Sequence, residues 1–208
     1  MLFRSGTVVL ADRQTAGRGR SGRTWTSEPG LGLWMTVLHR PVDVSGFDVL
    51  SLRIGLLVAP VLDRFADGRV TLKWPNDVLI ERRKLAGLLV EARWRESSLE
   101  WVAIGIGVNV VAPPGQPMAT GLRSGTRRSD LVRELVGPIR EACATAGVLT
   151  GDEMVAFSAR DAARGKRLAE PAQGRAGGIT NTGALIVETA TGAELFRRGS
   201  LVFASEEG

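Results

Sequence analysis

Histidine, cysteine and tyrosine are nearly missing from this 208-residue sequence, which contains one histidine, one cysteine and no tyrosine. The lone Cys143 cannot form an internal disulfide, which fits a reducing compartment such as the cytoplasm. His39 is the single histidine of the sequence. This argues against a Ser-His-Asp triad and against a histidine-rich metal site. We therefore expect a cytoplasmic protein without a metal site of its own.

Long apolar segments are missing as well. No run reaches the roughly 20 residues that a membrane-spanning helix needs, and the N-terminal MLFRSG is too short for a signal peptide. The formal net charge of +5 favours anionic ligands but is too small to require nucleic acid. We expect neither a membrane nor a nucleic-acid partner, and the length suits one medium domain with a small appendage.

Residues 14–25, QTAGRGRSGRTW, have a composition that suits neither a helix nor a strand. The glycines allow the backbone to approach a ligand, and the arginines supply planar charged groups that match phosphate; they are Gly17, Gly19, Gly22, Arg18, Arg20 and Arg23. The stretch predicts a loop that binds phosphate or a nucleotide, although a disordered basic loop or a nucleic-acid arm would have a similar composition. It is not a P-loop, because arginine replaces the lysine and turn residues follow in place of a helix.

The rest of the sequence divides into a large α+β region and a small all-β region. An apolar stripe at helical spacing predicts a helix over 48–65 that kinks or restarts at Pro60. Alternating apolar runs predict strands, and short β segments between glycine and asparagine turns follow residue 165. The expected strands of the large region are 7–11, 32–39, 70–73, 78–80, 85–92 and 99–111, and its later helices are 128–146 and 151–163.

Polar side chains follow the end of the strand at 70–73. Asn76 and Asp77 come directly after a Trp-Pro turn, so they can project from the strand end toward a site. Lys84 begins the second strand of the next hairpin. By itself this lysine reads more readily as a solvated hairpin residue, and Asp77 as a residue that merely hydrogen-bonds its own turn.

Three strand glycines suggest a surface without side chains. Gly87 lies within the second hairpin strand, where a glycine often marks the close approach of a ligand. Gly105 and Gly107 alternate on one face of the strand at 99–111, which leaves that face bare enough to seat a flat ligand. Asn109 is next on the same face.

Four segments then form a recognisable set in this order: GTVVLADRQTAGRGRSGRTW, LKWPNDV, RKLAGLLVE and GIGVNV. Together they resemble the biotin–protein ligases, from about residue 6 to residue 111 and more weakly through the C-terminal region. The resemblance implies an α+β fold with a mixed β-sheet and helices on one side, as in class II tRNA synthetases, followed by a small SH3-like β-barrel. We place the catalytic domain at 1–163 and the C-terminal domain at 164–208.

The resemblance also implies roles for the residues that match the family motifs. Lys84 would be the catalytic lysine that touches the biotin carboxylate and the α-phosphate, Arg20 would act beside it, and Asp77 would be the general base. The residues expected to bind biotin or its adenylate are Gln14 and Gly87 beside biotin, Trp25 near the adenine, Asn109 near the nucleotide, Gly17, Arg18, Gly19 and Arg20 in the loop, and Lys73, Asn76 and Lys84.

The implied activity is ATP-dependent ligation of biotin. The biotin carboxylate must attack the α-phosphorus of ATP, and cations placed between the two anions reduce their repulsion. Biotinyl-5′-AMP forms, pyrophosphate leaves with Mg²⁺, and a lysine of a biotin carboxyl carrier protein attacks the acyl carbon. The expected ligands are thus ATP, biotin and Mg²⁺, the expected partner is that carrier protein, and a homodimer is a further expectation.

Two features depart from the family pattern. Members carry a Ser-Thr-Asn segment that holds the ureido ring of biotin ahead of the GTVVLA strand, so we expect this chain to be incomplete at its N-terminus. Residues 168–178 also leave little room for the usual first hairpin of the barrel. The missing Ser-Thr-Asn segment supports an alternative to the ligase, a truncated or inactive module that binds biotin or a nucleotide. A lipoate or octanoate transferase ranks lower, because those enzymes lack the GRGRxGRxW loop.

Overall fold

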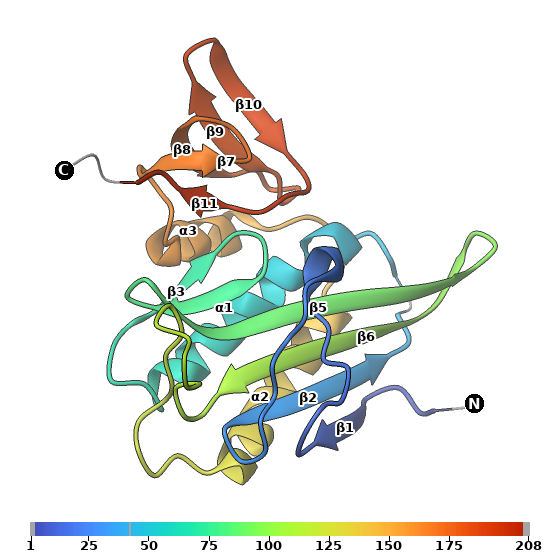
Figure 1. Ribbon diagram of the computed structural model, residues 1–208. Coiled ribbons are helices and arrows are strands. Elements are labelled where there is room, and N and C mark those ends of the chain that lie inside the picture. The colour runs from blue at the N-terminus through green and yellow to red at the C-terminus, as the bar shows by residue number, and fades with distance from the viewer. Residues whose placement is uncertain (1–2, 42, 206–208) are drawn as a thin grey trace.

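The computed structural model describes residues 3–41 and 43–205, whose strands form two sheets (Figure 1). The larger sheet has the order β1-β2-β6-β5-β4-β3 and consists of β1 (Thr7–Ala11), β2 (Gly32–His39), β3 (Val70–Lys73), β4 (Asp77–Ile80), β5 (Arg83–Arg95) and β6 (Ser98–Asn109). The smaller sheet has the order β10-β9-β8-β7-β11 and consists of β7 (Arg167–Glu170), β8 (Gly174–Ile179), β9 (Leu185–Thr189), β10 (Gly192–Phe196) and β11 (Val202–Phe203). The helices are α1 (Leu50–Asp63), α2 (Arg128–Ala144) and α3 (Gly151–Arg160), with short 3-10 turns at Arg20–Gly22 and Phe47–Val49.

Helices α1 and α2 cover one face of the larger sheet (Figure 1). Strand β6 shows how the sequence selects this face, because every second residue, as at Val102, Ile104 and Ile106, is buried in the core against the helices. The alternate residues Gly105 and Gly107 therefore lie on the opposite face, which α1 and α2 leave uncovered (Figure 1). The apolar period of the strand thus determines which face remains available for a site.

The smaller sheet packs against one end of the larger one, next to α3 (Figure 1). The indole N–H of Trp74, which follows β3, donates to the carbonyl of Gly183 in the β8–β9 turn at 3.0 Å. The backbone N–H of Leu149 donates to the carbonyl of Asn181 in the same turn at 2.9 Å. One turn of the smaller sheet is therefore attached to both the sheet and the helical layer of the larger unit.

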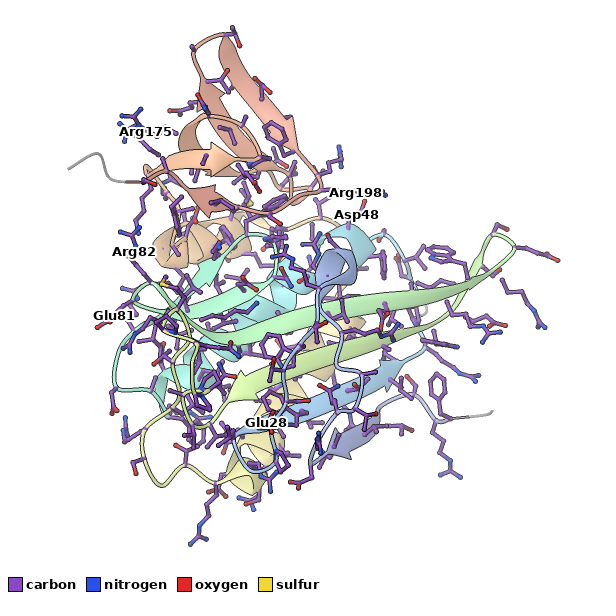
Figure 2. All side chains as sticks on the ribbon, viewed as in Figure 1. Glu28, Asp48, Glu81, Arg82, Arg175 and Arg198 are labelled. Atoms are coloured by element: carbon purple, nitrogen blue, oxygen red, sulfur yellow. The ribbon has the colours of Figure 1, made fainter. Side chains whose placement is uncertain are left out.

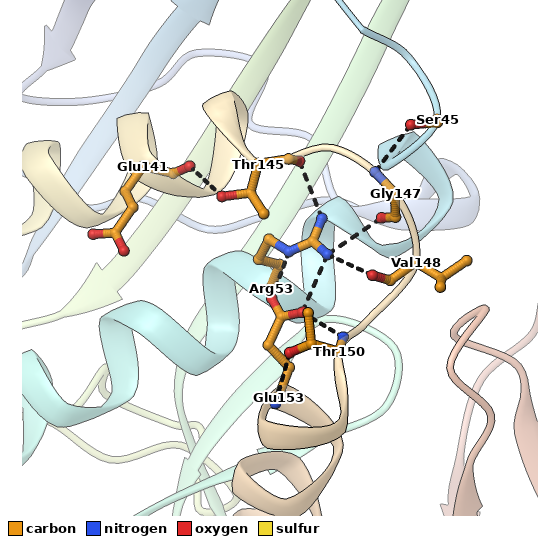
Figure 3. Close-up of polar contacts among 8 residues, drawn as sticks. All are labelled: Ser45, Arg53, Glu141, Thr145, Gly147, Val148, Thr150 and Glu153. Atoms are coloured by element: carbon orange, nitrogen blue, oxygen red, sulfur yellow. Dashed lines mark hydrogen bonds and ion pairs between the residues drawn. The ribbon is translucent and has the colours of Figure 1, made fainter.

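Helix α1 carries a buried arginine that ties the helices together (Figure 3). The Arg53 side chain is 1% exposed and forms an ion pair with Glu153 of α3, with Nε 2.5 Å from Oε1. Its guanidinium also donates to the backbone carbonyls of Thr145, Gly147 and Val148, in the segment that joins α2 to α3. A single side chain thus satisfies the carbonyls of a tight connection and fixes α3 against α1.

Three expectations about the fold need correction or stay open. The expectation of a mixed sheet is wrong, because every ladder of the larger sheet among the described residues is antiparallel. The parallel pairings are isolated bridges such as Lys84–Ala119. Short turns join β3, β4, β5 and β6 in succession, and such turns impose antiparallel neighbours. Helix α1 continues through Pro60 without restarting. The SH3-like barrel is not confirmed, since the smaller sheet is open between β10 and β11.

Charged side chains cover the outer surface of both units (Figure 2). Glu28, Asp48, Glu81, Arg175 and Arg198 are among the exposed ones. Across 3–41 and 43–205, no helix has the length and apolar character needed to cross a membrane.

Candidate active site

A cavity of about 440 Å³ lies on the face of the larger sheet that α1 and α2 leave uncovered. Its floor comes from β2, β4, β5 and β6, its roof from the 14–25 loop, and one wall from residues 199–202 of the smaller sheet. The charged residues that line it are five cations and two carboxylates: Arg18, Arg20, Arg23, Lys73, Lys84, Asp77 and Glu91. This excess of positive charge suits an anionic ligand.

The floor contains one row of residues that are paired across five neighbouring strands. The row runs from Trp34 in β2 through Gly107 in β6, Gly87 in β5 and Asp77 in β4 to Lys73 in β3. Side chains directly opposite one another share a face of the sheet, so the row passes from an aromatic ring over two bare glycines to two charged groups. The strand pairing therefore joins the KWPND and KLAG segments at one place.

The bare part of the row seats an indole ring of the protein itself. A Cβ built on Gly107 would lie 2.7 Å from Cε2 and Cζ2 of Trp25, and one on Gly87 would lie 2.9 Å from Cζ3. Real Cβ atoms do not approach ring carbons so closely, so glycine is required at both positions while Trp25 lies there. The flat surface predicted from the sequence exists, and Trp25 covers it.

Lys84 reaches the cavity because of a β-bulge. Strict alternation from Gly87 would place Lys84 on the helix-covered face, but Ala86 pairs with Val78 while Lys84 pairs with Leu79. Leu85 is therefore an extra residue, and the bulge turns the lysine toward the cavity. There its Nζ lies 2.6 Å from Oδ1 of Asp77 and 5.0 Å from the centre of the Trp25 ring.

The backbone of Lys84 is held on both sides. Its N–H donates to the carbonyl of Met118 at 2.8 Å, and its carbonyl accepts from the N–H of Thr120 at 2.9 Å. The buried Asn109 side chain also donates to this carbonyl, at 3.2 Å. The bulge is thus fixed by β6 and by the loop between β6 and α2.

The electrostatics of the cavity centre on Asp77. Burial lowers the pKa of Arg20, and neighbouring Arg23 lowers it further, against the attraction of Asp77. Burial likewise lowers the pKa of Lys73, which Asp77 opposes and Lys84 and Arg23 reinforce. These cations are held with less water and less counter-charge than they prefer, and a bound anion would relieve that cost.

The roof is a small hairpin that we call the strap (residues 17–25). The N–H of Gly19 donates to the carbonyl of Arg23, and the N–H of Trp25 donates to that of Gly17. A Cβ on Gly17 would lie 2.2 Å from the carbonyl oxygen of Trp25, so this glycine closes the strap. Gly17 therefore has a visible structural role within the strap.

Ten of the twelve predicted site residues line the cavity: Gln14, Arg18, Gly19, Arg20, Trp25, Lys73, Asn76, Asp77, Lys84 and Gly87. Gly17 and Asn109 do not line it, and support the strap and Lys84 respectively. The roles of all twelve in binding and catalysis stay predictions. His39 and Cys143 lie elsewhere, beside each other at the end of β2, and burial raises the pKa of the Cys143 thiol to about 11.

The lining residues that sequence reasoning missed include Trp34, Glu91 and Ser200. The alternation of β2 and β5 could have indicated the first two, because Trp34 and Glu91 lie on the cavity face of strands that were predicted. Ser200 had no local signal, since its position depends on how the smaller sheet packs. Within the described residues, no group of three or more His, Cys, Asp or Glu side chains is placed to hold a metal ion.

Solved structures of biotin protein ligases have a fold similar to that of this chain. The biotin protein ligase from Aquifex aeolicus in complex with biotin and ATP has a TM-score of 0.80 at 24% identity, covering 99% of this chain and 92% of that one. At this identity the likeness concerns the fold. The biotin protein ligase from Leishmania major in complex with biotinyl-5-AMP has a TM-score of 0.65 at 27% identity, covering 92% and 88%.

Sequence relatives match over part of their length. The bifunctional ligase/repressor BirA of Bacillus subtilis is 41% identical over 110 residues, 52% of this chain and 34% of that protein. The biotin–[acetyl-CoA-carboxylase] ligase of Mycobacterium tuberculosis is 40% identical over 125 residues, 56% of this chain and 45% of that protein. The chain therefore spans less than half the length of these relatives. The model of the biotin/lipoate A/B protein ligase family matches residues 2–109, a stretch that includes the strap, the KWPND turn, Lys84 and the glycine floor, and the chain belongs to this family.

Proposed function

We propose that this protein is an ATP-dependent ligase that forms biotinyl-5′-AMP and transfers biotin to a lysine of a biotin carboxyl carrier protein. The observation that carries the proposal is the position of Lys84, which a bulge turns onto the glycine floor beside Asp77. The solved relatives with biotin, ATP and biotinyl-5-AMP, and the biotin–[acetyl-CoA-carboxylase] ligases among the sequence relatives, support the choice of substrates and acceptor.

In the first step, positively charged side chains stabilise the negative charge of the two reacting groups. The biotin carboxylate attacks the α-phosphorus of ATP, the bond to the β-phosphate oxygen breaks, and pyrophosphate leaves. Lys84 and Arg20, on opposite sides of the cavity, place positive charge where both anions meet. Lys73, whose pKa burial lowers, adds positive charge from the end of β3.

In the second step, an amine of the acceptor must be neutral to attack the acyl carbon, whose bond to the phosphate oxygen then breaks so that AMP leaves. Asp77 is the carboxylate beside Lys84 and would take the proton from the incoming lysine. Until then water must be kept from the anhydride, and Trp25 with the rest of the strap covers the floor of the cavity. The indole N–H groups of Trp25 and Trp34 are buried and have no hydrogen-bond partner within the described residues.

The residues present do not fit a Mg²⁺ ion held by the protein. The cavity carboxylates Asp77 and Glu91 are each paired with a cation, Lys84 and Arg18 respectively. Mg²⁺ would therefore enter with the phosphates of ATP as part of the substrate.

The test is a two-stage reaction. The protein is incubated with ATP, Mg²⁺ and labelled biotin, biotinyl-adenylate is measured, and a biotin carrier domain is then added and its labelled lysine is located by mass spectrometry. Label on one carrier lysine supports the proposal. A folded protein that gives neither adenylate nor carrier label would show the alternative, an inactive binding module, to be correct. The same assay with lipoate or octanoate in place of biotin tests the other alternative, a lipoate or octanoate transferase.

Two further predictions remain part of this proposal. Residues 1–163 would form the catalytic domain and 164–208 a C-terminal SH3-like domain. A homodimer would be seen as a doubled mass in light scattering, and the proposed reaction does not depend on it.

A further inference from the structure

Two of the three strap arginines are already bound by the rest of the protein. Nη2 of Arg18 donates to Oε2 of Glu91 at 2.9 Å, and Nη2 of Arg23 donates to Oγ of Ser200 at 2.5 Å. Glu91 lies on the cavity face of β5, whereas Ser200 belongs to the smaller sheet just before β11. The strap is therefore attached on both sides of the cavity, once to each sheet.

The third arginine differs from the other two. Arg20 lines the cavity, and within 3–41 and 43–205 its side chain has neither an ion pair nor a hydrogen bond. Burial and neighbouring Arg23 lower its pKa against the attraction of Asp77, so this arginine lies in the cavity without a hydrogen-bonded anion. The three arginines of the GRGRxGR pattern thus separate into two that hold the strap and one that faces its contents.

We propose that Glu91 and Ser200 are positioning residues that hold the strap closed through Arg18 and Arg23, so that Arg20 is the strap arginine left for a phosphate group. The assignment of Arg20 to a phosphate rests on the proposed ligase function. The anchoring by Glu91 and Ser200 does not, because both contacts exist within the protein itself.

The contact between Arg18 and Glu91 is weak enough for the strap to open. The Arg18 side chain is 70% exposed and that of Glu91 is 39% exposed, and ion pairs in such surroundings stabilise weakly. Breaking this anchor should therefore raise the open fraction by only about two- to fivefold. A stronger anchor would hinder the entry of ligands and the approach of the acceptor lysine.

A charge-swap experiment on the ligand-free protein tests the first anchor. Arg18→Glu, Glu91→Arg and the double swap are treated with trypsin, and cleavage after Arg20 and Arg23 is followed by mass spectrometry. Rates are normalised to those of the same variant in urea. Each single variant should be cleaved about two- to fivefold faster than the parent, and the double swap should return close to the parental rate. Arg13→Glu and Glu194→Arg are matched controls, since both residues are exposed and have no ion pair within the described residues.

The second anchor is tested by Ser200→Ala, which removes the acceptor, and by Ser200→Thr, which keeps a hydroxyl. The alanine variant should be cleaved faster and the threonine variant at the parental rate. Ser98→Ala, at an exposed serine, is the control. Parental cleavage in the single swaps or in Ser200→Ala, or a double swap as open as the worse single variant, would overturn the anchoring.

Release of preformed biotinyl-adenylate completes the test. Glu91→Arg and Ser200→Ala, which change the anchors and leave Arg18 and Arg20 in place, should release it about two- to fivefold faster than the parent. If the parent makes no adenylate but the double swap restores protection from trypsin, the ligase function fails and the anchoring stands. If adenylate forms and no variant changes cleavage or release, the anchoring fails and the ligase function stands.

Discussion

At the scale of single residues, two glycines on one strand face have different neighbours. Gly107 lies directly beneath the Trp25 ring, whereas the nearest atom to a Cβ on Gly105 would be the carbonyl oxygen of Leu89 at an ordinary 3.5 Å. Both glycines belong to β6 and both point to the cavity, so the same substitution has different consequences two residues apart. What decides the outcome is whether the indole occupies the space.

Gly107→Ala should displace Trp25 from the floor, because its methyl group would lie 2.7 Å from two ring atoms. The expected result is a change in tryptophan fluorescence and faster tryptic cleavage of the strap. Gly105→Ala is the matched control and should leave both readouts at the parental level. Since the protein contains five tryptophans, each spectrum is compared with that of Trp25→Phe in the same background. An unchanged Trp25 signal in Gly107→Ala would contradict the observed packing.

Lys84→Ala should abolish adenylate formation and leave the protein folded. Its ammonium is the charge closest to Asp77, and electrostatic contributions of this kind are typically about 3–4 kcal/mol, or two to three decades in rate. Pyrophosphate exchange in the presence of biotin measures the effect. Arg83→Ala, at the neighbouring exposed arginine, should exchange at nearly the parental rate. Exchange within threefold of the parent in Lys84→Ala would show that this lysine is not catalytic.

At the scale of elements, the packing of α1 owes more stability to the buried Arg53–Glu153 ion pair than to the exposed ion pair at its C-terminal end. Arg53→Met should cost about 3–5 kcal/mol of the free energy of unfolding, because it leaves three carbonyls without their donor and Glu153 without its ion-pair partner. Urea unfolding measures the loss. Arg64→Met removes a pair at the C-terminal end of the same helix, where the arginine is 58% exposed, and should cost under about 1 kcal/mol. Equal losses in the two variants would contradict this.

The same ion pair predicts a dependence on acid. Burial alone would raise the pKa of Glu153, but the hydrogen bonds from Arg53 and Thr150 outweigh it and hold the pKa below its ordinary value of 4.5. A carboxyl whose pKa is lower in the folded state stabilises the fold above its ordinary pKa, and this contribution is lost as the pH falls through the lowered value. Glu153→Gln should therefore be less stable than the parent at neutral pH, with the difference shrinking below pH 4.5. A constant difference between pH 7 and pH 3 would contradict the assignment.

The elements themselves were largely predictable, and their assembly was not. The strand positions and the helices around 50–63 and 128–144 follow from apolar periodicity, and the cavity face of β6 follows from Gly105 and Gly107. The bulge at Leu85 was not predictable, because strict alternation places Lys84 on the wrong face and only pairing with β4 reveals the extra residue. The motif resemblance nevertheless directed attention to this lysine. Ser200 could not be found, since its place depends on contacts more than a hundred residues apart.

At the scale of the whole molecule, the cavity depends on both sheets. The larger sheet provides the floor and the strap, and the segment 199–202 closes one wall. Trp74 links the two units, because it lies between β3 and the KWPND polar residues and its indole N–H reaches the β8–β9 turn. Gly183 in that turn has φ of +82° and lies close to Leu52 of α1, so this docking contact tolerates little change. A change at Trp74 should therefore be detected at Ser200 and at the strap.

Trp74→Phe keeps an aromatic ring in a site that is 2% exposed, but removes the donor to Gly183. Leaving that part-buried carbonyl unpaired, together with the lost ring volume, should cost about 1–3 kcal/mol in urea unfolding. Because the turn would keep the hydrogen bond from Leu149 but lose the one from Trp74, amide exchange across 164–205 should accelerate more than exchange in β5 and β6. The wall at 199–202 would move with its sheet, so the strap should also be cleaved faster. Trp94→Phe, at a tryptophan that is 49% exposed, is the control. It should change the free energy of unfolding by less than about 0.5 kcal/mol and leave the rates of amide exchange and strap cleavage near those of the parent. If exchange accelerates equally in both sheets, Trp74 stabilises the larger unit alone and does not couple the smaller sheet to the cavity.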